Sequence, residues 1–374
     1  REFKSAEESR TKALTIADAN MPPGLDGQVI KAEDIVFGYW DWDKEIFVAD
    51  EDSRSAVRVV ARQDSLNENP IATFMLWMTG LYEWEVSVTS TFATYNPTCL
   101  MDGFVAQGYV DLQSNNSYFK GFCIHSNDHV EMNLNNYFEA GTVVSMPDLD
   151  DLELPASGME SNTGLEEALV EGSWNIRILQ QIDLIIAGVS STSSSFTPDY
   201  ISEYSEVIKL EDADIESGDL TSGRVHTYTC TNTGNDTKLS IKTDVKDVVI
   251  VTNCTIDFGS NVNLRSAVLA TTSTSSKSVQ GASGLVIGLN DNCGIGGEVQ
   301  IVTKGSFYTT AQMDVNDSQI LASGNIIFSS LGDGSKGISL VAGGYISGTS
   351  NMEMARCADA GSSNFQADYF AMVR

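Results

Sequence analysis

The sequence has few basic residues. Lys and Arg number 22 against 51 Asp and Glu, which gives a formal net charge of −29 over 374 residues. A nucleic-acid-binding protein needs a basic surface that displaces counterions from phosphates, and anionic lipid headgroups would repel this chain. The sequence also lacks a run of about 18 apolar residues, the length that a membrane-spanning helix requires. We therefore expect no nucleic-acid partner and no membrane span within these residues.

Recognisable catalytic motifs are missing as well. There is no G-x-S-x-G, no H-E-x-x-H and no phosphate-binding loop, and the chain has only three histidines. We expect a protein that is not an enzyme. The alternative is a polysaccharide-active enzyme, whose acids and bases would come from Asp257, Asp314, Arg265 and Lys304, although these four residues share no evident sequence position.

The chain contains six cysteines, and no two of them form a C-x-x-C pair, which argues against zinc ribbons and thioredoxin-type sites. An even number of cysteines in an acidic chain rich in Ser, Thr, Asn and Gly favours disulfides made in an oxidising compartment. Two pairs share one separation. We predict the disulfides Cys99–Cys123 and Cys230–Cys254, which leaves Cys293 with Cys357.

Residues 1–98 have the pattern of an α+β domain. The stretch from Glu2 to Ala19 lacks Gly and Pro and predicts a helix. Short apolar or alternating runs predict an antiparallel sheet, and a second helix is expected within it. The expected strands cover 34–40, 45–48, 56–62 and 85–95, and the expected second helix covers 71–81.

From Cys99 onward a short pattern recurs with a spacing of about twenty residues, typical of a repeat protein. Its variants are FVAQGYV from Phe104, CIHSNDHV ending at Val130, VIVTNCTI from Val249, IVTKGSF from Ile301, ILASGNI from Ile320 and LVAGGYI from Leu340. One such unit cannot bury its own apolar row, whereas stacked units can. The sequence therefore predicts a parallel β-solenoid in two sections, residues 99–147 and 249–374.

Residues 148–248 lose this period and are expected to be an insertion. Apolar residues recur at helical spacing from Gly164 to Ile186 and predict a long helix, and 199–210 suits a second one. Residues 224–231 and 238–243 flank the turn-forming residues 233–236 and predict a β-hairpin.

Asparagines mark the corners of the expected coils. Asn115 and Asn116 lie one period before Asn135 and Asn136. Asparagine stacked at a coil corner bonds to its equivalent in the next coil and tolerates left-handed backbone. We predict an asparagine ladder.

Two groups of residues are candidate metal ligands. His125, Asp128 and His129 could hold a transition metal. The spacing of the two histidines suits a helix, whereas the segment is predicted to be strand and turn, so the structural interpretation is favoured. The second group could bind calcium, the only cofactor the sequence suggests, but it lacks an EF-hand loop and suits a solvated turn. It consists of Asp148, Asp150, Asp151 and Glu153.

Several segments resemble one known family. The stretches DIVFGYWDWDKEIFVAD from Asp34, SAVRVVAR from Ser55 and EVSVTSTFATY from Glu85 are similar to the TadG-like branch of the TadE/TadG family, and the Asn-rich continuation from Cys99 resembles alphaproteobacterial members. That resemblance implies a pilin-like head and a role in the tight-adherence (Flp) pilus system. It also implies a hydrophobic anchor helix before Arg1. The Asp-x-Ser-x-Ser metal motif of some TadG-like proteins is absent.

We therefore expect a non-enzymatic, extracytoplasmic structural component of a Tad-type pilus or related appendage in a Gram-negative bacterium, located at the cell surface, in the pilus or in the periplasm. Its expected partners are other pilus or cell-surface proteins, and self-association through the solenoid ends is a further expectation. The alternatives are the secreted enzyme and a general surface adhesin.

Overall fold

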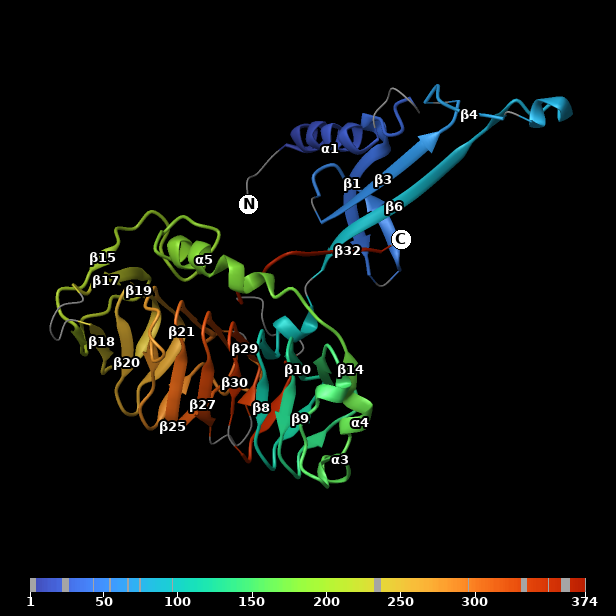
Figure 1. The fold of residues 1–374 in the computed structure, drawn as a ribbon. Coiled ribbons are helices and arrows are strands. Elements are labelled where there is room, and N and C mark those ends of the chain that lie inside the picture. Colours follow the sequence, from blue (N-terminus) through green and yellow to red (C-terminus); the bar gives the residue numbers. More distant parts are fainter. Residues whose placement is uncertain are drawn as a thin grey trace. The chain divides into compact units, whose positions relative to one another are not determined.

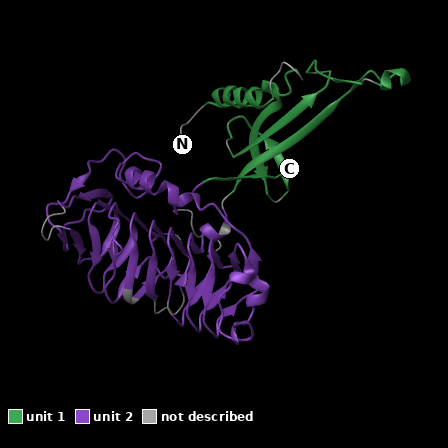
Figure 2. Ribbon diagram, viewed as in Figure 1, with its two compact units in different colours: residues 1–95, 368–374 green, residues 96–367 purple. Residues whose placement is uncertain are grey.

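The computed structural model describes residues 5–21, 27–42, 44–53, 55–65, 67–73, 75–95, 97–231, 237–294, 296–330, 335–348, 350–357 and 364–373. The chain forms two compact units (Figure 2). Unit 1 consists of Arg1–Tyr95 together with Asp368–Arg374, and unit 2 consists of Asn96–Ala367.

The described residues of unit 1 form an antiparallel sheet and one α-helix, as the α+β pattern predicts. Helix α1 spans Ala6–Asn20 and begins with a capping box between Ser5 and Glu8. The sheet has the order β2-β1-β3-β6-β32. Its strands are β1 (Ile35–Asp41), preceded by the short helix η1 (Ala32–Asp34), β2 (Ile46–Ala49), β3 (Ala56–Gln63), β6 (Val86–Tyr95) and β32 (Tyr369–Met372). Strand β32 comes from the end of the chain and pairs with β6. The predicted solenoid section, 249–374, therefore extends too far, because residues 369–372 belong to the sheet of unit 1.

The predicted helix over 71–81 is wrong. The described residues there form β4 (Ile71–Ala72), one short 3-10 turn, η2 (Leu76–Thr79), and then β5 (Glu83–Trp84), which pairs with β4. The turn ends at Gly80, whose φ of 87° is left-handed. No described residue of η2 is buried, so no packed surface supports a longer helix.

Unit 2 is a parallel β-solenoid, which confirms the main feature of the predicted fold (Figure 1). Its coils contribute strands to three faces. The first face contains, in spatial order, β15 (Ile208–Lys209), β17 (Arg224–Tyr228), β19 (Val245–Thr252), β21 (Asn263–Thr271), β24 (Val299–Thr303), β26 (Ser318–Ala322), β29 (Ile338–Ala342), β7 (Gly103–Ala106), β10 (Cys123–Ser126), β13 (Val143–Met146) and β14 (Leu169–Glu171).

The second face contains β16 (Asp214–Ile215), β18 (Lys238–Ile241), β20 (Thr255–Phe258), β22 (Val279–Gln280), β25 (Phe307–Val315), β27 (Ile326–Ser330), β30 (Ile346–Ser347), β8 (Val110–Leu112) and β11 (Val130–Met132). Strand β23 (Leu285–Ile287) pairs with the ends of β21 and β25 on the third face, where β28 (Ser335–Lys336), β31 (Glu353–Ala355), β9 (Ser117–Phe119) and β12 (Tyr137–Phe138) also pair.

The solenoid is one continuous stack, although the chain builds it in two pieces. Strand β29, from the last coil in the sequence, pairs in parallel with β7, from the first coil, so that Leu340 lies beside Phe104. The stack therefore runs from β15 to β29, continues with β7 and ends at β14. The chain enters and leaves unit 2 in the middle of the stack, next to this join between Leu340 and Phe104.

A long crossover makes this order possible. Residues 172–207 lead from β14, at one end of the stack, to β15, at the other end (Figure 1). The crossover contains η5 (Arg177–Gln181) and α5 (Ile182–Val189), and α5 contacts β19, β21 and β24. The predicted helix from Gly164 to Ile186 is therefore wrong. Helix α4 (Leu165–Ala168) is a single turn, and β14 follows it directly. A glycine inside a helix is destabilising because of its backbone entropy, and Gly172 would lie inside the predicted one.

The predicted hairpin is also wrong. Strand β17 pairs with β19 and β18 pairs with β20, all in parallel, because β17 and β18 are successive sides of one coil. The predicted turn, 233–236, lies outside the described residues. The helix expected over 199–210 is not formed either, since β15 occupies its end. Residues 208–231 and 237–248 are thus solenoid rather than insertion.

The structure contains the three predicted disulfides, Cys99–Cys123, Cys230–Cys254 and Cys293–Cys357. Cys230–Cys254 links equivalent positions of adjacent coils, because one coil is 24 residues long there and Arg224 pairs with Val248. Cys99 lies in η3 (Thr98–Leu100), before β7, and is bonded to Cys123 at the start of β10. One coil is 20 residues long there, since Gly103 pairs with Cys123, so the two equal separations have different origins. The core between the faces is apolar and includes stacked and edge-on aromatic rings. Phe104 lies 5.2 Å from Phe122 and 5.6 Å from Phe328, measured between ring centroids. The contact with Phe328 spans the join between the two pieces.

Candidate functional site

Two columns of side chains run side by side along the outside of the second face, near the join. The first is aromatic. The rings of Tyr345 and Tyr109 stack with centroids 4.7 Å apart, and the His129 ring stacks on Tyr109 at 5.3 Å. Each of these residues directly precedes a strand, β30, β8 or β11, so the parallel register brings them together.

The second column is acidic. Asp111 and Glu131 are register partners in β8 and β11, and Glu153 bridges Glu131 from the terminal coil. Like charges directly opposite one another destabilise a sheet. Both carboxylate oxygens of Asp111 have hydrogen-bond partners, because they accept from Gln113 Nε2 (2.7 Å) and Ser347 Oγ (2.9 Å). The carboxylates of Glu131 and Glu153 have no hydrogen-bond or ion-pair partner among the described residues.

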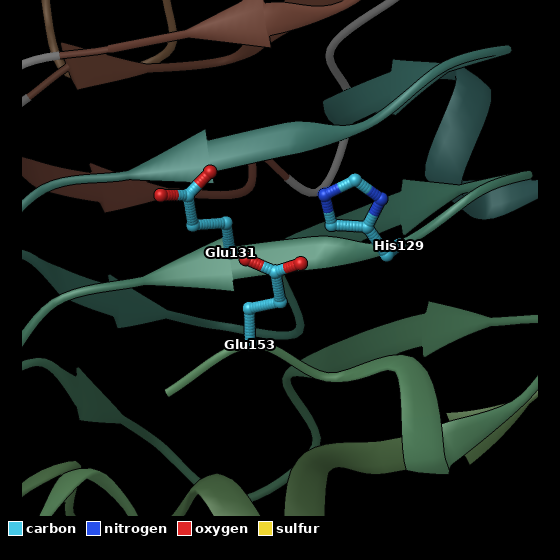
Figure 3. Close-up of side chains that lie close together, drawn as sticks. All are labelled: His129, Glu131 and Glu153. Carbon is cyan, nitrogen blue, oxygen red and sulfur yellow. The ribbon is translucent and has the colours of Figure 1, made fainter. Parts of the chain in front are cut away.

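His129, Glu131 and Glu153 meet where the two columns adjoin (Figure 3). One ligand atom from each residue lies within 4.8 Å of the others, and no other group of this kind occurs among the described residues. His129 directly precedes β11 and Glu131 lies within it, two residues further on, so both side chains are on the same side of the chain. Nδ1 of His129 lies 3.3 Å from the Asp128 carboxylate, while the opposite edge of the ring faces the two glutamates. The site could hold a cation.

The predicted histidine pair is not assembled. His125 is fully buried in β10, and its ring stacks on Trp174 with centroids 4.4 Å apart. Its Nε2–H donates to Asn127 Oδ1 (3.0 Å), and its Nδ1 forms a hydrogen bond with Ser145 Oγ (2.7 Å). Burial lowers its pKa, with the hydrogen bond to Asn127 opposing the shift. His125 and His129 belong to different faces of the coil because the chain turns between them. The contacts of His125 therefore support a structural role in the core rather than metal binding.

Three of the four calcium candidates stay apart from the cluster. Asp148 caps the short helix η4 (Leu149–Asp151) by accepting a hydrogen bond from the backbone of Asp150 (3.0 Å). Glu153 alone joins His129. Glu131 was missed at the sequence level. The signal that would have found it is the His-x-Glu alternation in a strand, which places both side chains on one surface, together with an acid one coil later.

The asparagine ladder is present and longer than predicted. Oδ1 of Asn116 accepts from the backbone of Met352 (3.1 Å), Oδ1 of Asn136 accepts from Asn116 (2.9 Å), and Oδ1 of Asn162 accepts from Asn136 (2.8 Å). The preceding asparagines are left-handed, with φ values of 63° at Asn115, 63° at Asn135 and 64° at Asn351. The ladder crosses the join between the two pieces of the solenoid.

The residues nominated for the enzyme alternative lie in separate columns. Asp257 aligns with Ser240 and Gln280, and it pairs with Lys238 (3.1 Å). Asp314 aligns with Val286, and Arg265 with Lys246. Lys304 pairs with Asp183 of α5 (2.9 Å). The register thus gives these four residues no common surface.

Comparisons with curated proteins and with solved structures find no match. A family model does match, over residues 103–358. These residues include the coils on both sides of the join, the crossover, and His129, Glu131 and Glu153. The match covers more than half of the chain, which therefore belongs to the family described as "Domain of unknown function (DUF7867)".

Proposed function

We propose that this protein is a non-enzymatic structural component of a bacterial surface appendage of the tight-adherence pilus type, acting in assembly or adhesion. In this proposal the solenoid is a rigid rod, and unit 1 contacts other surface proteins. The resemblance of unit 1 to TadG-like proteins supports the choice of system.

The disulfides support the location. Three disulfides indicate an oxidising, extracytoplasmic environment, and the described part of the chain has no free cysteine. Among the described residues, no helix has both the length and the apolar character needed to span a bilayer.

The observation that carries the proposal is an exposed apolar segment in unit 1, residues 69–73 and 75–88, which we call the apolar arm. No charged residue occurs between Asn69 and Tyr82. Met75 and Met78 are each 78% exposed, and Trp77 is 56% exposed. Proteins that act alone rarely expose a continuous apolar patch of this kind, because its contact with water is unfavourable. The arm suits burial against another subunit of the assembly.

The test is immunogold electron microscopy of source cells, with an antibody raised against residues 249–361. Cells carry either the wild-type chain or the double variant Trp77→Ser/Met78→Ser. The matched control is Trp42→Ser, since Trp42 is 55% exposed, lies in the same unit and is outside the arm. We expect label along or at the tips of filaments for the wild type and the control, and loss of filament label for the double variant.

Label confined to the envelope in all strains would contradict the filament role and favour an assembly factor or adhesin. Signal only in the medium would favour the secreted enzyme, and activity on acidic polysaccharide that is abolished by Asp257→Asn or Asp314→Asn would establish that alternative.

A further inference from the structure

We propose that His129, Glu131 and Glu153 form a binding site for a divalent transition-metal ion, with Zn²⁺ as the probe, and that the ion joins the last two coils of the solenoid. This inference does not depend on the proposed function.

The side chains supply a mixed donor set of one imidazole and two carboxylates. Imidazole nitrogen suits zinc and neighbouring transition metals, whereas calcium takes six to eight oxygen ligands. Asp111 does not add to the oxygen count, because Gln113 and Ser347 already bind both of its oxygens. The three remaining donors are the number that a zinc ion with an open fourth position uses.

The geometry requires only a small adjustment. Zinc–ligand bonds of about 2.0 to 2.2 Å put tetrahedral donors about 3.3 to 3.6 Å apart. The ligand atoms here lie within 4.8 Å of one another. Both glutamates are exposed, so rotation of their side chains can bring the carboxylates closer.

The histidine is held in place before any ion binds. Tyr109 stacks against its ring, and the Asp128 carboxylate lies 3.3 Å from Nδ1. A carboxylate on the second ring nitrogen is the usual partner of a metal-bound histidine, since it orients the ring and raises its basicity. The nitrogen on the other side is left for the ion.

The electrostatic surroundings also favour a cation. Glu131 and Glu153 are adjacent in the ladder, and Asp111 is the next acid in the same column. Between residues 103 and 176 the only Lys or Arg is Lys120, whose positive charge is too isolated to balance the acidic residues of these coils. A bound ion would neutralise the repulsion between the two glutamates and link β11 to the terminal coil.

The experiment is isothermal titration of the full chain with ZnCl₂, together with thermal unfolding in EDTA and in excess Zn²⁺. We expect one Zn²⁺ per chain. Glu131→Gln, Glu153→Gln and His129→Gln should each weaken binding at least ten-fold, and Asp128→Asn should weaken it about ten-fold because it acts through the ring. The matched control is Glu167→Gln, an exposed glutamate of the same end of the solenoid.

In thermal unfolding, the difference in Tm between the wild type and Glu131→Gln should change sign when Zn²⁺ replaces EDTA. In EDTA, Glu131→Gln should raise the Tm, because it removes one of the charges in register. In excess Zn²⁺ the wild type should gain stability and the variant should not, so the order of the two reverses. Each of four results would overturn the proposal. Glu167→Gln weakens zinc binding as much as the site variants do, His129→Gln binds zinc as tightly as the wild type, the wild type binds Ca²⁺ as tightly as Zn²⁺, or the wild type binds no zinc.

Discussion

Replacing Asn116 by Ala should weaken the join between the two pieces of the solenoid. Asn116 is 1% exposed. Its Oδ1 accepts from the backbone N–H of Met352 (3.1 Å), and its Nδ2 donates to the carbonyl of Gln113 (2.9 Å). Each buried backbone group left without a partner costs about 1 to 3 kcal/mol. The Met352 amide is buried, whereas the Gln113 carbonyl is only partly buried and can bind water instead, so the variant should lose about 1 to 3 kcal/mol in free energy of unfolding.

Urea denaturation followed by circular dichroism measures this loss, and hydrogen exchange locates it. In Asn116→Ala the Met352 amide should exchange faster than in the wild type. The matched control is Asn136→Ala, which removes the same kind of contacts one coil later and exposes the Asn116 amide instead. An unchanged unfolding midpoint with a protected Met352 amide would refute the idea that the ladder stabilises the join.

Three further outcomes are expected. Burial, opposed by the backbone of Cys357 and by Arg356, raises the pKa of Asp102 from 3.8 to about 6, and burial with nearby carboxylates raises that of Asp317 to about 7. Their contribution to stability is therefore fully present below about pH 4 and is lost as the pH rises through 6 to 7. The urea midpoint of the wild type should fall between about pH 4 and 7, and it should fall less in Asp102→Asn and Asp317→Asn. An equal pH dependence of the midpoint in wild type and variants would contradict this. Removing the Cys230–Cys254 disulfide by a double Ala substitution should cost about 2 to 5 kcal/mol, and non-reducing peptide mapping of the wild type should find all three disulfides. Phe104→Ala should cost about 3 to 5 kcal/mol, measured by the same urea titration, and a loss below 1 kcal/mol would mean that the two pieces do not depend on this ring.

Local patterns were sufficient for the coil itself. The recurrence of apolar pairs followed by a turn predicts stacked parallel strands, because a single unit exposes an apolar row that only another unit can cover. The Cys230–Cys254 disulfide follows from the same cause, since a chain that advances one coil of 24 residues returns to the neighbouring position. Cys99 lies before the first coil, where a coil is 20 residues long, so its equal separation from Cys123 does not come from the repeat. Asn116 and Asn136 were predictable for that reason too.

The errors lie where a local pattern fits two structures. The stretch from Gly164 to Ile186 has apolar residues at helical spacing, yet it contains a terminal coil and the start of the crossover. Residues 224–231 and 238–243 look like the arms of a hairpin, yet each continues a parallel face. In both cases the secondary structure depends on which distant strands pair with the segment, and the local spacing of apolar residues does not show which strands those are.

By itself, the sequence determined the repeat and the asparagine corners, because both depend on the length of one coil. It also predicted the cysteine pairs, although only Cys230–Cys254 spans one full coil. Only the tertiary structure decided which coils are neighbours. All coils present nearly the same apolar surface, so Leu340 could stack on any of them, and it is the crossover that leaves the β29 edge facing β7. The meeting of His129 and Glu131 with Glu153 has the same origin, since an acid on the next coil becomes a neighbour only once the register is set.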